Sequence, residues 1–276
     1  MIKILVTTDF SKQSVSAIRY AIGLSAVNNA KLTFFYSLHL FNPVSLSEKE
    51  SHFFETEEVA KIRRRLRQFI LQRYGEMRIQ CGELDCVVSV SDIPQSDIRE
   101  YAQKFRYDYI CIGTRGAGRF ARFLGTNAAN TIIFSTVPVI AVPAGYNGGV
   151  PVSIMYASDL RNIGREIKKV VALASSLNAS IQLLHFIPTS GTVTGSREPK
   201  IDTKTLTRYP VRLTVRHLDY LQNLVTQIKK AVKKDKPSML IMFTNQHRTL
   251  FQRLFHPSKS AQFSFDSKIP ILVFNK

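Results

Sequence analysis

The stretch IKILVTTDFS, residues 2–11, decides the fold class of this chain. Its first five residues are mostly aliphatic and β-branched, which is typical of a buried strand. The Thr, Asp and Ser residues that follow favour a turn and the beginning of a helix. Apolar residues then recur at helical spacing over residues 15–27, and a second apolar run covers residues 32–38. A strand, a helix and a second strand are therefore predicted for residues 2–38.

The alternation of strands and helices continues as far as residue 142. Strands are predicted over residues 86–90, 109–113 and 139–142, and helices over residues 59–70, 97–105 and 128–134. Strands separated by helices form parallel sheets that carry helices on both faces. The first half is therefore predicted to be an α/β domain with a doubly wound, Rossmann-like parallel sheet.

The second half of the chain repeats the first in outline. ILVTTD at residues 4–9 matches IMYASD at 154–159, and VPVIAV at residues 137–142 matches IPILVF at 269–274. The offset between matching positions falls from 150 residues at the first pair to 132 at the second, so the second copy has lost residues. Between its second strand and residue 210 it is rich in Thr, Ser, Gly and Pro and lacks a long apolar stripe, so the loss is placed there.

Two tandem α/β domains with five parallel strands each are therefore predicted, the second copy being degenerate. The first covers residues 1–146, and the second covers residues 151–276 and is shortened after its second strand. Glycine and proline interrupt the pattern over residues 144–151, where the boundary is expected.

The overall composition argues against several protein classes. Hydrophobic residues make up 45% and charged residues 21% of the 276 residues, which is typical of folded globular chains. Cys81, Cys86 and Cys111 lack CxxC spacing, so neither a disulfide framework nor a zinc site is expected, and a reducing cytoplasm is the expected location. The six histidines show no metal-ligand spacing, so no metal is assigned. Neither a cleavable leader nor a membrane-spanning run is evident, so export and a membrane span are not expected.

Positive charge is concentrated in the second half of the chain. Residues 1–150 hold 18 Lys and Arg against 13 Asp and Glu, a net charge of +5, whereas residues 151–276 hold 20 against 7, a net charge of +13. Basic runs over residues 61–73 and 229–236 are interpreted mainly as solvated helix faces. The second-half charge leaves open a nucleic acid, an anionic lipid surface or an acidic protein as partner. No RNA-recognition motif or helix-turn-helix supports the nucleic acid.

A glycine-rich loop carries the main candidate chemistry. GTRGAGRFARFLGTN, residues 113–127, follows the strand at 109–113. Ligands of open parallel sheets lie beyond the carboxyl ends of the strands, where helix N-termini offer N–H groups to anions. Glycine lets the backbone approach a phosphate closely, and Thr126 adds a hydroxyl group. The loop is a candidate phosphate site, and a loop that serves only backbone geometry is the alternative.

The whole chain resembles the universal stress protein family in its tandem, two-domain form. ILVTTDFS at residues 4–11, DYICIGTRG at 108–116, GTN at 125–127 and VPV at 137–139 carry the resemblance. It implies a fold like that of the adenine nucleotide alpha hydrolases and a regulatory role in the stress response. Family members with Gly, two residues, Gly, nine residues, Gly, then Ser or Thr bind ATP.

Carried over position by position, the resemblance implies an adenine nucleotide site in the first domain. Asp9 matches the family aspartate beside the nucleotide, and Ser37 is expected near the base. Two features depart from the pattern, because eight residues separate Gly116 from Gly125 and Thr7 replaces a common proline. ATP is the expected cofactor, with Mg²⁺ only as its companion. The expected binding residues are Thr7, Thr8, Asp9, Ser37, Gly113, Thr114, Arg115, Gly116, Gly125, Thr126 and Asn127.

The second copy lacks the glycines of this pattern. Phe243 and the three residues after it replace the first glycine pair, and residues 255–258 replace the last glycine. Bulky side chains would fill the space that a triphosphate needs, so the second domain is expected not to bind nucleotide. The resemblance also implies an intrachain pseudo-dimer through residues 139–142 and 271–274, and leaves a homodimer open.

Asp9, Asp159 and Ser11 have simpler interpretations than catalysis. The two aspartates end equivalent strands without a histidine or second carboxylate placed beside them by sequence, so each is predicted to cap a helix or hold a ribose. Ser11 is predicted to be a cap.

Three functions remain open from the sequence. The first is a regulatory module that binds ATP in its first domain and communicates nucleotide state to other proteins. The second is a slow ATPase or adenylyl transferase, although HxGH and GxxxxGK[ST] motifs are absent and no base can be assigned. The third is an interaction protein that acts without nucleotide through its basic second half.

Overall fold

The computed structural model describes residues 1–276 except 41–46, 115–125, 189–206, 220, 244–266 and 275–276. The chain divides into two compact units, Met1–Asn147 and Gly148–Lys276, and each is described by itself. The break between the units lies within the boundary segment 144–151 proposed from the sequence.

The first unit contains a parallel sheet of order β3-β2-β1-β4-β5. The chain moves outward from β1 to β2 and β3 and then returns to place β4 on the other side of β1. The strand order therefore reverses between β1 and β4, as in doubly wound folds. Its strands are β1 (Lys3–Thr7), β2 (Lys31–Leu38), β3 (Asp85–Val90), β4 (Tyr109–Gly113) and β5 (Val139–Val142).

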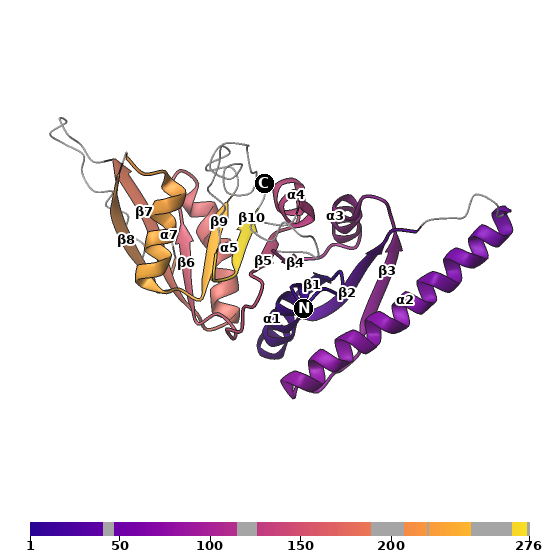
Figure 1. Ribbon diagram of the computed structural model, residues 1–276. Helices are drawn as coiled ribbons and strands as arrows, with labels where there is room; N and C mark the ends of the chain where they lie inside the picture. Colours follow the sequence, from indigo (N-terminus) through magenta and orange to yellow (C-terminus); the bar gives the residue numbers. More distant parts are fainter. Residues whose placement is uncertain (41–46, 115–125, 189–206, 220, 244–266, 275–276) are drawn as a thin grey trace. The chain divides into compact units, whose positions relative to one another are not determined.

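The five predicted strands of the first unit are confirmed, and β4 and β5 agree to the residue. The residues of β4 and β5 are almost wholly apolar because helices cover both faces of the sheet. Figure 1 shows α1 (Ser14–Asn28) and α2 (Glu48–Met77) on one face, and α3 (Pro94–Lys104) and α4 (Thr126–Phe134) on the other. Ile4, Leu5 and Val6 of β1 are at most 1% exposed, so β1 lies in the core between the two layers.

Helix α2 is much longer than its apolar pattern predicted. A capping box between Ser47 and Glu50 begins it eleven residues before the predicted start at residue 59. Only Leu66 and Ile70 are buried on α2, and both belong to the predicted apolar face. Arginine residues 63–65 are exposed, which confirms a solvated basic face.

The second unit contains a parallel sheet of order β8-β7-β6-β9-β10. This order corresponds strand for strand to the order of the first unit. The strands are β6 (Ser153–Ala157), β7 (Ser180–Pro188), β8 (Val211–Leu218), β9 (Met239–Phe243) and β10 (Ile271–Phe274). Residues 189–206, which contain most of the segment where the sequence predicts a loss, lie outside the described residues.

Helices α5 (Ile163–Ser176) and α7 (Leu224–Asp235) accompany this second sheet. Apolar spacing over Leu221, Leu224, Val225 and Ile228 predicts a helix that already includes Leu221, and that prediction is wrong. Asn223 caps the helix by accepting the Thr226 N–H at 2.8 Å, so Leu221 precedes α7 and is 97% exposed. Apolar spacing extended the predicted helix through a residue that the cap excludes. Within the described residues, no helix has the length and hydropathy needed to cross a membrane.

Candidate functional site

Parallel pairing brings several of the predicted binding residues to one edge of the first sheet. Val6 of β1 pairs with Phe34 of β2 on one side and with Cys111 of β4 on the other. Continuing that register places Thr8 level with Gly113, and Asp9 level with Thr114. This is also where the strand order reverses, which is the usual ligand position in a doubly wound sheet.

A tight turn directly after β1 orients Asp9. The Thr8 N–H donates to the Phe35 carbonyl at 3.1 Å, and the Thr8 hydroxyl accepts the Phe10 N–H at 3.1 Å. Phe10 has a φ of 60°, in the left-handed region, so the chain reverses there. The carboxylate of Asp9 accepts the Ser11 N–H at 3.0 Å, and Asp9 is exposed at the edge of the sheet.

Hydrogen bonding at the start of α1 corrects the capping role assigned to the aspartates. The Ser11 hydroxyl accepts the Ser14 N–H at 3.2 Å, but the N-cap position of α1 is Gln13, whose side chain makes no capping bond. Asp9 instead bonds the N–H two residues ahead, which is an Asx turn and not a helix cap. Asp159 makes the same bond to the Arg161 N–H at 3.0 Å. Each carboxylate therefore stabilises the turn that follows its strand, through an N–H that precedes the helix.

Gly113 lies where a strand end meets the beginning of a helix. A Cβ atom at this position would stand 3.2 Å from the Gln13 carbonyl oxygen and 3.4 Å from the Ser14 Cα. Both neighbours are backbone atoms and cannot rotate away. The next residue, Thr114, donates its N–H to the Val142 carbonyl at 2.9 Å, which fixes the end of β4. Glycine therefore allows β4 to approach α1 closely, and a side chain here would push the two backbones apart by a few tenths of an ångström.

Sequence reasoning missed Asp97, which controls the surroundings of Ser37. The two carboxylate oxygens of Asp97 accept hydrogen bonds from Ser37 at 2.7 Å and from Ser89 at 2.8 Å. Asp97 lies in the first turn of α3, so one side chain joins α3 to β2 and β3. An acidic residue just after Pro94 was the available signal, because carboxylates favour the first turn of a helix. The hydroxyl proton of Ser37 is committed to Asp97.

An aromatic and arginine cluster stands beside the turn and was also missed. The ring of Phe10 lies 4.7 Å from the ring of Tyr36 and 5.4 Å from that of Phe69. The guanidinium carbon of Arg65 lies 4.5 Å from the Phe10 ring centroid, a cation–π arrangement. A positive charge from the basic face of α2 thus lies next to the turn that carries Asp9.

The remaining predicted residues are only partly placed. Thr126 and Asn127 begin α4. Arg115, Gly116 and Gly125 lie outside the described residues. Across the parts of the chain that the structure describes, no three His, Cys, Asp or Glu side chains form a group suited to a metal ion.

The second unit builds the same turn at the equivalent edge. Ser158 donates its N–H to the Leu184 carbonyl at 3.0 Å and accepts the Leu160 N–H at 3.0 Å through its hydroxyl. Leu160 has a φ of 70°, like Phe10 in the first unit. Backbone geometry after the first strand is therefore shared by the two units.

A buried hydroxyl network distinguishes the second unit beneath this turn. Tyr156 hydrogen bonds to Glu166 and, at 3.0 Å, to Ser158. Burial raises the pKa of the Tyr156 phenol well above its usual range, and the bond to Glu166 raises it further. Because Val6 occupies the equivalent place in β1, the first unit has no counterpart of this phenol.

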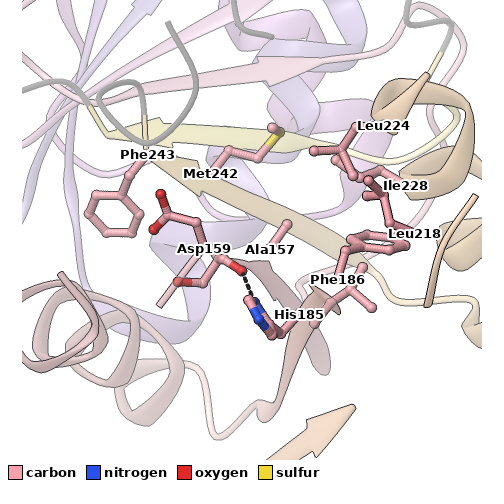
Figure 2. A pocket seen from close by; sticks show the side chains of 11 residues that line it. Ala157, Asp159, His185, Phe186, Leu218, Leu224, Ile228, Met242 and Phe243 are labelled. Atoms are coloured by element: carbon pink, nitrogen blue, oxygen red, sulfur yellow. Dashed lines mark hydrogen bonds between the residues drawn. The ribbon is translucent and has the colours of Figure 1, made fainter. Parts of the chain in front are cut away.

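The principal difference between the two edges is at the end of the fourth strand. Met239 pairs with Ile154 as Tyr109 pairs with Ile4, so Phe243 stands at the register of Gly113. The ring of Phe243 stacks on Phe274 at 4.7 Å between centroids. Phe243 lines a cavity with a volume of about 220 Å³. Figure 2 shows Asp159 and His185 among the other side chains of its wall.

Comparison with known proteins decides the family. Residues 1–143 match the profile of the universal stress protein family. The chain belongs to the universal stress protein family. The chain has no significant match among curated proteins.

Solved structures give the same fold over both units. A universal stress protein from Archaeoglobus fulgidus DSM 4304 matches with a TM-score of 0.67 at 14% identity, covering 99% of this chain and 98% of its own. A functionally unknown protein from Pseudomonas aeruginosa PAO1 matches with a TM-score of 0.57 at 13% identity, over 99% and 92% of the two chains. A universal stress protein solved in complex with cAMP is 20% identical over 51% of this chain and 96% of its own, with a TM-score of 0.37.

Proposed function

We propose that this universal stress protein is a stress-response regulator that binds an adenine nucleotide, ATP first among them, in its first unit. The nucleotide lies beyond the carboxyl ends of β1, β2 and β4. The second unit does not bind nucleotide. Family membership supports this proposal, and so does the position of Asp9 and Gly113 at the ends of the adjacent strands β1 and β4, where the strand order reverses.

The single observation that carries the proposal is the close approach at Gly113. The missing side chain lets the end of β4 lie against the Gln13 carbonyl and Ser14, at the amino-terminal end of α1. The dipole of that helix favours an anion there. The glycine-rich loop after Thr114 begins at this point in the sequence. A phosphate-bearing ligand fits such an edge, because backbone close to its oxygens can donate hydrogen bonds.

The residues of the proposed site have separable roles. Asp9 offers carboxylate oxygens to the ribose hydroxyls. Gly113, with Gly116, Gly125 and Thr126 of the loop, holds the phosphates through backbone N–H and hydroxyl groups. Ser37 lies next to the base as an acceptor, since its own proton is donated to Asp97. Mg²⁺ accompanies the phosphates and requires no carboxylate cluster of the protein.

A matched pair of variants tests the proposed site. ATP binding to the full chain is measured by titration calorimetry for the wild type, Asp9→Ala and Asp159→Ala. Both aspartates make the same bond to the N–H two residues ahead, so the structural consequences of the two changes are comparable. We expect at least a ten-fold loss of affinity for Asp9→Ala and no change for Asp159→Ala. Equal affinities in all three proteins would show that Asp9 does not contact the nucleotide. If the wild type binds no ATP, the proposed ATP site itself is wrong.

The alternatives to this function give different readouts. Release of phosphate from ATP over hours, abolished by Asp9→Ala, would make the protein a slow ATPase. The net charge of +13 on residues 151–276 supports the other alternative, a nucleotide-independent interaction with an acidic partner. Salt-sensitive binding of an acidic protein in the absence of ATP would favour it. The pseudo-dimer through β5 and β10 and a homodimer stay predictions.

A further inference from the structure

The second unit contains a formed cavity at the edge where the first unit carries its proposed nucleotide site. The ends of β6, β7 and β9 contribute residues 157–159, residues 184–186, Met242 and Phe243 to its wall. Its volume is about 220 Å³. In Figure 2 these side chains surround one space, with Met242 and Phe243 on one strand and Asp159 on the neighbouring turn.

Apolar side chains form most of the remaining wall. Leu218 from the end of β8, and Leu224 and Ile228 from α7, close the side away from Phe243. The wall thus joins four strand ends and one helix, which are the parts of the unit that its own packing makes rigid. A concave apolar space held by rigid elements is the usual form of a small-molecule site.

Polar groups at the cavity are mostly engaged within the protein. His185 hydrogen bonds through Nδ1 to the Ser158 carbonyl at 2.9 Å, drawn as the dashed line in Figure 2. The carboxylate of Asp159 accepts the Arg161 N–H at 3.0 Å and lies 3.7 Å from the Arg161 guanidinium. A ligand would therefore gain more from apolar contact than from hydrogen bonds.

The described residues of the wall offer no cation to an anionic ligand. Although residues 151–276 hold 20 Lys and Arg, the described residues that line the cavity include neither type. Among the described lining residues, the only carboxylate is that of Asp159. From these described residues, a phosphate or carboxylate ligand would gain no cation in return for its lost hydration.

Phe243 further excludes a nucleotide from this space. Its ring is held by stacking on Phe274 and by an edge contact with Tyr156, at 4.7 Å and 5.5 Å between centroids. It therefore stays at the position where the first unit has only the hydrogen of Gly113. A base alone has the right size for the cavity, but the phosphates attached to it would meet this ring.

We propose that the second unit binds a compact, uncharged, apolar molecule in this cavity, such as a single or fused aromatic ring. An engineered apolar cavity of about 150 Å³ holds benzene, so about ten non-hydrogen atoms fit here. The proposal concerns the second unit alone and stands whether or not the first unit binds nucleotide.

Indole is the probe for a direct test on the full chain. The protein has no tryptophan, so indole fluorescence can be excited apart from the tyrosines. We expect a saturable blue shift of its emission, with a Kd on the order of 0.1 mM for a ligand of this size. Indole-3-acetate has the same ring with a negative charge and is expected to bind at least ten-fold more weakly. Equal or tighter binding of the acetate would overturn the proposal, as would the absence of any saturable shift with indole.

Two measurements locate the bound ring. Ala157→Leu places a larger side chain in the cavity and is expected to abolish indole binding, whereas Ala172→Leu makes the same change on the exposed side of α5 and is the control. In wild-type protein labelled at methionine methyl groups, indole is expected to shift the Met242 resonance, assigned with Met242→Leu, and not that of buried Met239. An unshifted Met242 signal at saturation would overturn the assignment of the site even if Ala157→Leu failed to fold.

Discussion

The carboxyl edges of the two sheets begin alike and then diverge. In both units the first strand ends in the same turn, with an aspartate carboxylate bonded to the N–H two residues ahead. Beside that turn the first unit has Gly113, and the second has Phe243 at the same register. At this position the first unit has backbone packed against backbone, whereas the second unit has a stacked aromatic ring beside its cavity.

A second difference concerns how each unit uses the helix that follows its third strand. Asp97 of α3 accepts bonds from serines on β2 and β3, including Ser37. Gln227, one turn into α7, instead bonds the backbone of Asp219 at 2.9 Å through both its amide atoms. Phe186 stands where the first unit has Ser37 and lines the cavity. The same framework therefore supports a polar edge in one unit and an apolar edge in the other.

Removing the Phe243 ring from the edge of the second sheet should cause the largest loss of stability. Phe243→Ala leaves Phe274 and Tyr156 without their aromatic partner and creates a void, which is expected to lower the free energy of unfolding by about 3 kcal/mol. Urea unfolding followed by circular dichroism measures the change. Phe134→Ala, a residue that is 60% exposed, is the control and should cost less than about 0.5 kcal/mol. Equal losses would show that the Phe243 ring does not stabilise the second edge.

Adding a single methyl group at Gly113 should have the next largest effect. In Gly113→Ala the new Cβ stands 3.2 Å from a backbone oxygen, so β4 and α1 must separate slightly. We expect a loss of about 1–2 kcal/mol in unfolding free energy and weaker ATP binding. Gly149→Ala serves as the control because nothing lies within 4 Å of its added Cβ. An unchanged stability of Gly113→Ala would mean that the close approach is not required.

Halving the acceptor capacity of Asp97 should have a smaller effect. Asp97→Asn replaces one carboxylate oxygen by an NH2 group, so either Ser37 or Ser89 can no longer donate there and must turn its hydroxyl to accept a weaker, uncharged hydrogen bond. We expect the free energy of unfolding to fall by about 1 kcal/mol, with faster hydrogen exchange at the amino-terminal turn of α3. Asp92→Asn is a suitable control, since its side chain is 79% exposed. If both variants exchange like the wild type, Asp97 does not hold α3 against the sheet.

Removing the cation beside Phe10 should have the smallest effect. Arg65→Ala takes away the guanidinium above the ring and is expected to cost about 0.5 kcal/mol, measured by thermal unfolding. Arg64→Ala, also on the exposed face of α2, is the comparison. A larger loss for Arg64→Ala would indicate that the contribution of this face is helical propensity and not the contact with Phe10.

Strand positions were largely predictable from local sequence, but the residues around the site were not. Parallel strands buried on both faces give apolar runs, so β4 and β5 could be assigned to the residue. Asp97 and Phe10 depend on contacts between elements far apart in sequence, as in the bond from Ser37 to Asp97. Spacing along one element carries no signal for such contacts. The early start of α2 was not predicted, because its first turns contain no apolar stripe. Only the Ser47 cap marks the beginning of this helix.

The sequence by itself determined the alternation of strands and helices, the repeat and the family, because periodicity and short motifs are local properties of a chain. Only the tertiary structure decided that Asp9 makes an Asx turn and that the second edge encloses a cavity. These depend on which backbones and side chains meet across the sheet. A glycine in one strand and a phenylalanine in its counterpart have different consequences only once the neighbouring strand and helix are in place.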